Sequence, residues 1–258
     1  MVGLPRSPAS LLLSLGAPPA GGEDRAEGPR PAPAGASARR RLLAAALSLA
    51  LAAGLVNPAG PAAAPDPIRI AVLGDSLSSG YGLGPGASFP EQLEEALRRR
   101  GYAVEVQNAG VAGDTAAGGR ARTEWVLASR PHLLVVELGA NDGLRRLPVD
   151  QMEAHLDAIL AAAHRAGARP LLTGMRAPAN LGRGYARAFQ AVFPRLARAH
   201  GVPLYPFFLE GVAGVPALNQ PDGIHPNRDG VARIVEGILP LMIEAIEALS
   251  TSGAASPR

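Results

Sequence analysis

The strongest constraint on the fold is the regular alternation, from residue 68 to residue 249, of short apolar runs with stretches of helical periodicity. Each apolar run has a length that suits a buried strand. We expect strands over residues 68–73, 103–106, 132–138, 170–173 and 202–205. Strands that alternate with helices across short connections predict a parallel sheet covered by helices on both faces. The sequence therefore predicts an α/β fold, a three-layer α/β/α arrangement around a five-stranded parallel sheet.

The helical stretches carry start signals that support this interpretation. Ser88 and Glu91 have the spacing of a capping box, and Phe89, Leu93 and Leu97 recur on one face of the helix that follows. Further helices are expected over residues 115–130, 150–166, 185–200 and 227–249. No linker and no internal repeat interrupts this pattern, so we expect residues 65–258 to form one domain.

The residue types that are absent exclude several kinds of chemistry. There is no cysteine among the 258 residues, which excludes disulfides, thiolate metal sites and a cysteine nucleophile. All 25 basic residues are arginine, which excludes a Schiff-base lysine and the lysine of a phosphate-binding loop. The net charge of +3 lies entirely in residues 1–64, because acidic and basic residues balance in residues 65–258. A neutral domain argues against nucleic acid as a partner, since such binding needs a basic face.

The N-terminal quarter has the layout of an export signal. Three arginines at positions 39–41 precede an uncharged apolar run over 42–56, and small residues follow at 62–64. These three parts together are typical of a secretory signal peptide. We therefore interpret residues 39–64 as a signal peptide, for either general or twin-arginine export, and residues 1–38 as a disordered extension or a mis-assigned start.

This interpretation predicts a periplasmic or secreted protein whose mature chain begins near Ala63 or Ala64. Two alternatives stay open for the run over 42–56. It is short for a membrane anchor, because spanning a bilayer takes about 20 apolar residues. It can also be read as an alanine-rich buried helix of the folded protein.

A serine follows the first expected strand, in the sequence Gly74-Asp75-Ser76. Functional groups collect at the carboxyl ends of the strands in parallel sheets. Asp222 and His225 lie three residues apart just before the last expected helix. A nucleophilic serine needs a base within hydrogen-bonding reach and a carboxylate that orients the base. These residues are therefore a candidate Ser-Asp-His triad, although Ser76 taken alone is more often a helix N-cap.

Two other strand ends offer donors for the negative oxygen that forms when a serine attacks a carbonyl. Gly113 follows the second strand, and its N–H is accessible because glycine has no side chain. Asn141 follows the strand over 132–138 and can donate through its amide. Asn141 taken alone is more often a turn residue.

These blocks, in this order, resemble the SGNH hydrolases, also called GDSL esterases and lipases, over roughly residues 68–250. Several longer stretches resemble the periplasmic acyl-CoA thioesterase, arylesterase and lysophospholipase subgroup. They are residues 74–81, 136–145, 178–180, 206–208 and 222–228. The resemblance implies a flavodoxin-like sheet and a hydrolase that cleaves carboxylic esters and thioesters.

The resemblance also implies a role for each matched residue. Ser76 is the nucleophile, Asp222 orients His225, and His225 is the general base and then the acid. Three donors form the oxyanion hole: the backbone N–H of Ser76, the backbone N–H of Gly113 and the side-chain amide of Asn141. Three further residues match a substrate-binding region that includes a mobile acyl-binding loop: Gly143, Leu144 and Pro178.

The resemblance implies no metal and no organic cofactor. The expected substrates are fatty-acyl thioesters, lysophospholipids or aryl esters, and the expected protein is a monomer with transient contact to lipid or membrane surfaces. A carbohydrate O-acetyl esterase of the same fold is the main alternative activity. A binding module that keeps the fold without catalysis is a second alternative, and the complete set of candidate residues argues against it.

Overall fold

The computed structural model describes residues 66–251, without the side chains of Ala179, Ser250 and Thr251. The interpretations of residues 1–38 and 39–64 lie outside the described residues. Among those described, no helix has both the length and the apolar character needed to cross a membrane.

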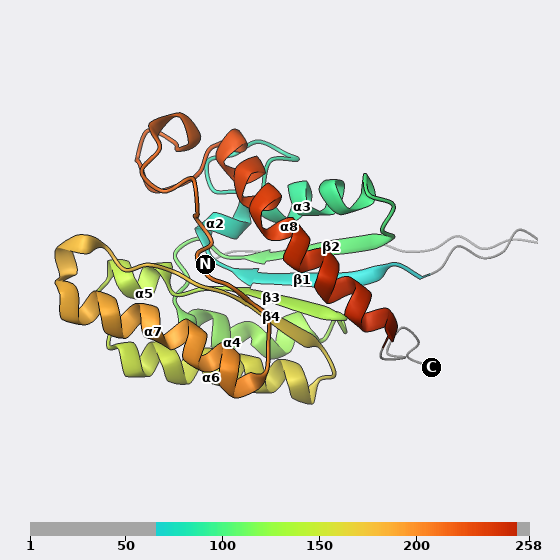
Figure 1. Cartoon of the computed structure of the whole chain (residues 1–258), viewed down its shortest axis with the longest axis horizontal. Helices are drawn as coiled ribbons and strands as arrows, with labels where there is room; N and C mark the ends of the chain where they lie inside the picture. The colour runs from blue at the N-terminus through green and yellow to red at the C-terminus, as the bar shows by residue number, and fades with distance from the viewer. Residues whose placement is uncertain (1–65, 252–258) are drawn as a thin grey trace, which may run out of the picture. The chain divides into compact units, whose positions relative to one another are not determined.

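A five-stranded sheet runs through the described part of the chain (Figure 1). Its strands are β1 (Ile68–Gly74), β2 (Val104–Gly110), β3 (Leu133–Glu137), β4 (Arg169–Thr173) and β5 (Leu204–Tyr205). All neighbouring pairs are parallel, in the order β2-β1-β3-β4-β5. The strand order reverses direction between β1 and β3, and such a switch point is where open α/β sheets bind ligands. The predicted fold class is therefore confirmed.

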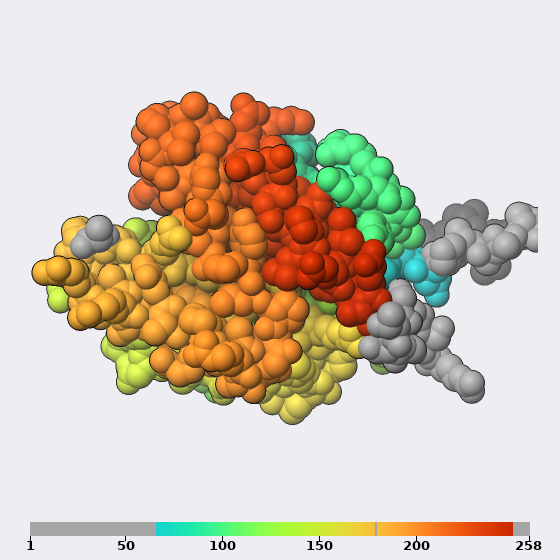
Figure 2. Space-filling view, viewed as in Figure 1, coloured from blue at the N-terminus to red at the C-terminus, as the bar shows by residue number. Residues whose placement is uncertain are grey.

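Helices cover both faces of the sheet (Figure 1). One face carries α3 (Phe89–Arg98) and α8 (Arg228–Thr251). The other face carries α4 (Ala116–Leu127), α6 (Val149–Arg165) and α7 (Arg183–His200). Shorter helices lie at the strand ends and in loops, namely α2 (Ser76–Ser79), α5 (Ala140–Leu144), η1 (Ala179–Leu181) and η2 (Pro216–Leu218). Figure 2 shows α8, in red, along the outside of one face, with the orange segment that contains η2 projecting beside its start.

The apolar strands are buried because helices pack on both of their faces. Val72, Leu73 and Val135 are fully buried at the centre of the sheet. On the face that carries α3, Phe89 packs edge-to-face on Phe208 with ring centroids 4.9 Å apart. On the opposite face, Phe189 of α7 is also fully buried. The core is thus divided between two layers that together fix the position of the central strands.

The helix starts follow the sequence signals. Ser88 and Glu91 form the predicted capping box at the start of α3, and the Thr115 side chain caps α4. The strand β2 is longer than the predicted 103–106 because it pairs with β1 along its whole length, up to Gly110 opposite Gly74. The strand β5 is shorter than predicted and has only two residues.

Candidate active site

The Ser76 turn is built where β1 ends and α2 begins. Asp75 is the N-cap of α2, and its Oδ1 accepts from the backbone N–H of Leu77 at 3.0 Å. The turn packs directly against the end of β2, where a Cβ on Gly110 would lie 2.5 Å from the backbone nitrogen of Ser79. Only glycine permits this close approach. The neighbouring strand ends therefore determine where the Ser76 side chain lies.

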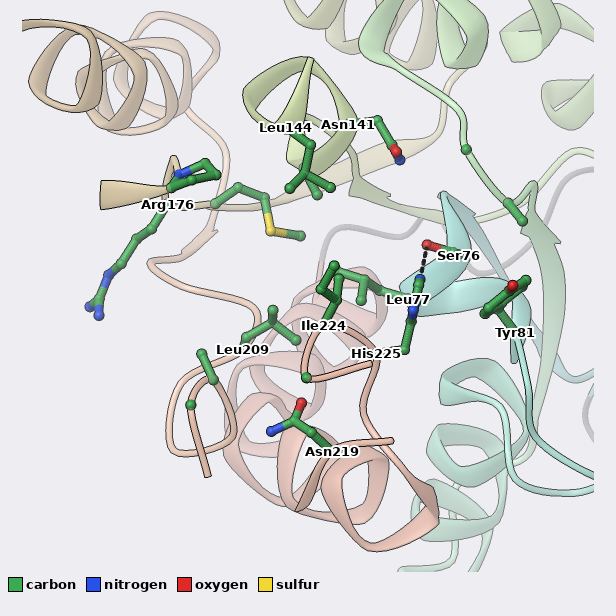
Figure 3. Close-up of a pocket in the computed structure, with 18 of the residues that line it drawn as sticks. Ser76, Leu77, Tyr81, Asn141, Leu144, Arg176, Leu209, Asn219, Ile224 and His225 are labelled. Atoms are coloured by element: carbon green, nitrogen blue, oxygen red, sulfur yellow. Dashed lines mark hydrogen bonds between the residues drawn. The ribbon is translucent and has the colours of Figure 1, made fainter. Parts of the chain in front are cut away.

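Ser76, His225 and Asp222 form one chain of hydrogen bonds, of which Figure 3 shows the bond between Ser76 and His225. The Nε2 atom of His225 lies 2.9 Å from Ser76 Oγ, and its Nδ1 lies 2.6 Å from Asp222 Oδ2. The other carboxylate oxygen of Asp222 accepts from the backbone N–H groups of Ile224 and His225, at 2.9 and 3.0 Å. These bonds, led by the backbone N–H of His225, lower the pKa of Asp222 to about 2. Asp222 is thus an ionised partner for the imidazole at neutral pH.

The loop that carries His225 is fixed by residues that the sequence interpretation did not identify. The backbone N–H of Gln220 donates to the His225 carbonyl oxygen at 2.7 Å. The Gln220 side chain donates to the carbonyl oxygen of Tyr81 at 2.8 Å. The Tyr81 ring lies beside the imidazole with ring centroids 4.7 Å apart. The two contacts of Tyr81 join segments more than one hundred residues apart, so no local pattern in the sequence marks them.

Two backbone N–H groups of residues that line the cavity beside Ser76 have no acceptor in the contacts of the described residues. Ser76 is the first residue of α2, so its N–H has no acceptor within the helix. Gly113 has a positive φ of 83° in the loop after β2, and its N–H has no hydrogen-bond partner within residues 66–251. Both residues line the same cavity. The two N–H groups are therefore candidate donors to an oxyanion bound to Ser76.

The side chain of Asn141 is the third candidate donor, and both of its amide hydrogens already have acceptors. Its Nδ2 donates to Asp75 Oδ2 at 3.0 Å and to the carbonyl oxygen of Asp114 at 2.9 Å. Asn141 comes from α5, which follows β3, and it lines the cavity. An oxyanion can bind Asn141 only by displacing one of these two acceptors.

Arg122 connects the loops that carry the candidate oxyanion donors. From α4 it donates to the carbonyl oxygens of Gly74, at 2.7 Å, and Ala109. Its Nε also lies 2.6 Å from Asp114 Oδ2. One guanidinium therefore joins the ends of β1 and β2 to the loop that presents Gly113. The sequence interpretation placed Arg122 in a helix and gave it no role.

A cavity of about 720 Å³ opens beside Ser76. Figure 3 shows Leu144, Leu209 and Ile224 around it, with Ser76 and His225 at one side. Other apolar side chains in its wall are Leu77, Met175, Pro178 and Phe207. Most of the wall is apolar, as expected for a site that binds hydrocarbon.

Of the three residues expected to bind substrate, Leu144 and Pro178 line the cavity and Gly143 does not. Gly143 is buried behind the wall, where a Cβ would lie 3.3 Å from the Phe189 ring and 3.6 Å from Pro178. Its contribution is to let α5 pack closely against α7. Arg176 lies at the edge of the cavity, with its guanidinium over the Phe207 ring and pointing away from Ser76 (Figure 3).

Comparisons with known proteins agree with this geometry. Esterase TesA of Pseudomonas aeruginosa is 41% identical over 172 residues, which cover 66% of this chain and 86% of that protein. Thioesterase 1/protease 1/lysophospholipase L1 of Escherichia coli K12 is 46% identical over 169 residues, which cover 65% of this chain and 79% of that protein. The crystal structure of TesA superimposes with a TM-score of 0.66 and 39% identity, covering 69% of this chain and 99% of that one.

The family model described as the GDSL-like lipase/acylhydrolase family matches residues 72–233. This match includes the end of β1 and the Ser76 turn as well as the segment that contains His225. The resemblance drawn from the sequence motifs is therefore confirmed. The chain belongs to the GDSL-like lipase/acylhydrolase family and is an ester-bond hydrolase.

Proposed function

We propose that this protein hydrolyses carboxylic esters and thioesters by two-step acyl transfer through Ser76. The observation that carries the proposal is the continuous hydrogen-bond chain from Ser76 through His225 to Asp222 at the side of an apolar cavity. Asp222 holds the imidazole so that Nε2 faces the serine hydroxyl. This is the arrangement that activates a serine nucleophile.

In the first step Nε2 of His225 takes the proton of Ser76 Oγ while Oγ forms a bond to the substrate carbonyl carbon. The carbonyl π electrons move to oxygen, and the oxyanion accepts from the N–H groups of Ser76 and Gly113 and from the Asn141 amide. Each such donor lowers the barrier by on the order of 3 kcal/mol. When the tetrahedral intermediate collapses, His225 gives its proton to the departing alcohol or thiol.

In the second step a water molecule attacks the acyl-enzyme. His225 takes a proton from the water as its oxygen bonds to the acyl carbon, and the same donors hold the second oxyanion. Collapse breaks the bond between Oγ and the acyl carbon, and His225 returns the proton to Ser76. The carboxylic acid is released and the resting enzyme is restored.

The shape and polarity of the cavity favour substrates with a fatty-acyl group. Its apolar wall can take up hydrocarbon, and removal of that surface from water contributes about 25 cal/mol per Å². We propose fatty-acyl thioesters, lysophospholipids and aryl esters as the substrate classes. The name of the Escherichia coli relative, which includes thioesterase and lysophospholipase, supports the first two. We also propose that the protein is a monomer that makes transient contact with lipid surfaces. The support for lipid contact is three exposed side chains at the rim of the cavity, those of Tyr81, Leu144 and Ile224.

We further propose that the enzyme acts in the periplasm or outside the cell. In this proposal residues 1–38 are an extension or a mis-assigned start, residues 39–64 are the signal peptide and residues 65–258 are the hydrolase domain. The support is the basic and apolar pattern of residues 39–64. N-terminal sequencing of exported protein tests it, and a product that starts before residue 39 would reject it.

The decisive experiment combines a substrate panel with covalent labelling. Thioesters, lysophospholipids, p-nitrophenyl esters and acetylated sugars are assayed with the wild type, Ser76→Ala and the neighbouring Ser79→Ala as a matched control. Turnover is expected with acyl substrates and is lost only in Ser76→Ala, and a phosphonate inhibitor labels Ser76 in mass spectra. Unchanged turnover in Ser76→Ala would reject the nucleophile, and preference for acetylated sugars would identify the alternative activity.

A further inference from the structure

Two buried carboxyls lie under the Ser76 turn, and the reaction proposed above uses neither as acid or base. The side chains of Asp75 and Glu137 are both fully buried. Glu137 is the last residue of β3, and its Oε2 accepts from Ser78 Oγ at 2.6 Å and from the Asp75 N–H at 3.3 Å. Its Oε1 has no hydrogen-bond partner among the side chains and backbone that the structure describes.

The two carboxyls differ in how well each can hold a negative charge. Ionising the two carboxyls together costs much free energy, because like charges repel strongly where water is excluded. Asp75 has a donor on each oxygen, the Leu77 N–H and the Asn141 amide, both at 3.0 Å. Glu137 has donors on one oxygen only. The charge is therefore better stabilised on Asp75, and the proton belongs on Glu137.

The pKa shifts of the two carboxyls also favour the charge on Asp75. Burial raises the pKa of Asp75 to about 6, against the lowering effect of its two donors. Burial, together with the nearby charge of Asp75, raises the pKa of Glu137 well above its ordinary value. These shifts agree with the hydrogen bonds, which place the charge of the pair on Asp75 and its proton on Glu137.

The ionised Asp75 has a direct consequence for Asn141. Of the two acceptors on the Asn141 amide, Asp75 is a carboxylate and the Asp114 carbonyl is neutral. Hydrogen bonds to ionised groups are about twice as strong as neutral ones. A substrate oxyanion will therefore displace the Asp114 carbonyl, while the bond to Asp75 keeps the amide in place.

We propose that Glu137 is a positioning residue for ester hydrolysis, a neutral carboxylic acid that leaves Asp75 as the ionised partner of the Asn141 amide. Glu137 acts through Asp75 and does not touch the substrate. The proposal rests on the proposed function above, since that function gives Asn141 its role at the oxyanion.

Kinetics of two Glu137 variants test the proposal. Glu137→Ala leaves the Asp75 N–H and the Ser78 hydroxyl without an acceptor, and we expect kcat to fall at least about tenfold with KM within about twofold. Glu137→Gln supplies a neutral side chain of the same shape and should restore most of the lost kcat. A Glu137→Gln variant as slow as Glu137→Ala, or a Glu137→Ala variant with full kcat, would overturn the proposal.

A matched control separates positioning from general loss of stability. Thr173 ends β4, is fully buried and donates to the Val136 carbonyl oxygen at 3.2 Å. Thr173→Val removes one buried hydrogen bond from the same sheet without contact to Asp75. It should lower the Tm and leave kcat unchanged. If Thr173→Val lowers kcat as much as Glu137→Ala does, the effect at Glu137 is structural and the proposal is wrong.

Infrared difference spectroscopy tests the neutral state of Glu137 without any turnover. The wild-type spectrum minus the Glu137→Gln spectrum at pH 8 should contain the carbonyl stretch of a protonated carboxyl. The same band is expected in a Ser76→Ala background, where catalysis is absent. A carboxylate signature instead of this band would overturn the proposal, whereas failure of the proposed function would be seen as activity in Ser76→Ala with the band unchanged.

Discussion

Replacing Asp75 with Asn should make the folded protein more stable at neutral pH while it lowers activity. Burial raises the pKa of Asp75 from 3.8 to about 6. Below about pH 3.8 the carboxyl is protonated in the folded and unfolded chain alike, and between these two values only the unfolded chain ionises. The free energy of unfolding therefore decreases as the pH rises through this window, and the loss is complete above about pH 6.

The size of the effect follows from the pKa shift and the hydrogen bonds. A shift of about two pH units corresponds to about 3 kcal/mol. The Asn amide can still accept from the Leu77 N–H, but its NH₂ group then faces the Asn141 amide, so one hydrogen bond of about 1–1.5 kcal/mol is lost. We expect a net gain of about 1–2 kcal/mol at pH 8. For a domain of this size the Tm should rise by about 2–8 °C.

Thermal unfolding followed by circular dichroism at pH 4 and pH 8 measures this effect. Glu124→Gln, an exposed change on α4, controls for the loss of one negative charge. The gain for Asp75→Asn should be present at pH 8 and absent at pH 4, where the lost hydrogen bond makes the variant slightly less stable than the wild type. The kcat for a p-nitrophenyl ester should fall at least about tenfold because Asn141 loses its carboxylate partner. A variant that is less stable than the wild type at pH 8, or whose gain is the same at both pH values, would refute the reasoning.

Three further predictions test the site and its support. Asn141→Ala should lower kcat for a p-nitrophenyl ester by about 10²–10³ with little change in KM, and a loss confined to KM would contradict its oxyanion role. Gly110→Ala should cost at least about 2 kcal/mol, because its Cβ would meet the backbone of the Ser76 turn, whereas Gly84→Ala, with nothing within 4 Å, should be neutral or stabilise by up to about 1 kcal/mol in urea unfolding. Phe89→Ala should lower the free energy of unfolding by about 3–5 kcal/mol, and a smaller cost would mean that the core collapses around the gap.

The fold was predictable because its signals are local and repeat along the chain. The apolar run at 133–136 predicts a strand buried on both faces, and the capping box at Ser88 marks a helix start by itself. The missed elements lack such signals. The helices α2 and α5 have four and five residues, too few for a helical period, and they form because the strand ends hold their first turns. The full length of β2 depends on pairing with β1, which no window of its own sequence contains.

The candidate site was predictable to the extent that its residues lie in short motifs. Asp222 and His225 are close in sequence, so one turn can hold them together, and the structure brings them to Ser76. The partners of these motifs were not predictable in the same way. Glu137 reads as the polar end of a strand, and only its burial beside Asp75 shows that its carboxyl is unusual. Burial of this kind depends on the packing of the whole chain.

The register of the sheet explains why these separate motifs meet. Gly74 of β1 is paired with Gly110 on one side and with Glu137 on the other, so three chain segments leave the sheet at the same level. The segments that follow them carry Ser76, Gly113 and Asn141. The buried carboxyls of Asp75 and Glu137 at this edge lower the stability of the fold. The negative charge of Asp75 holds the Asn141 amide in place. Neutral side chains in place of these carboxyls would therefore give a more stable sheet, but the Asn141 amide would no longer be held in position.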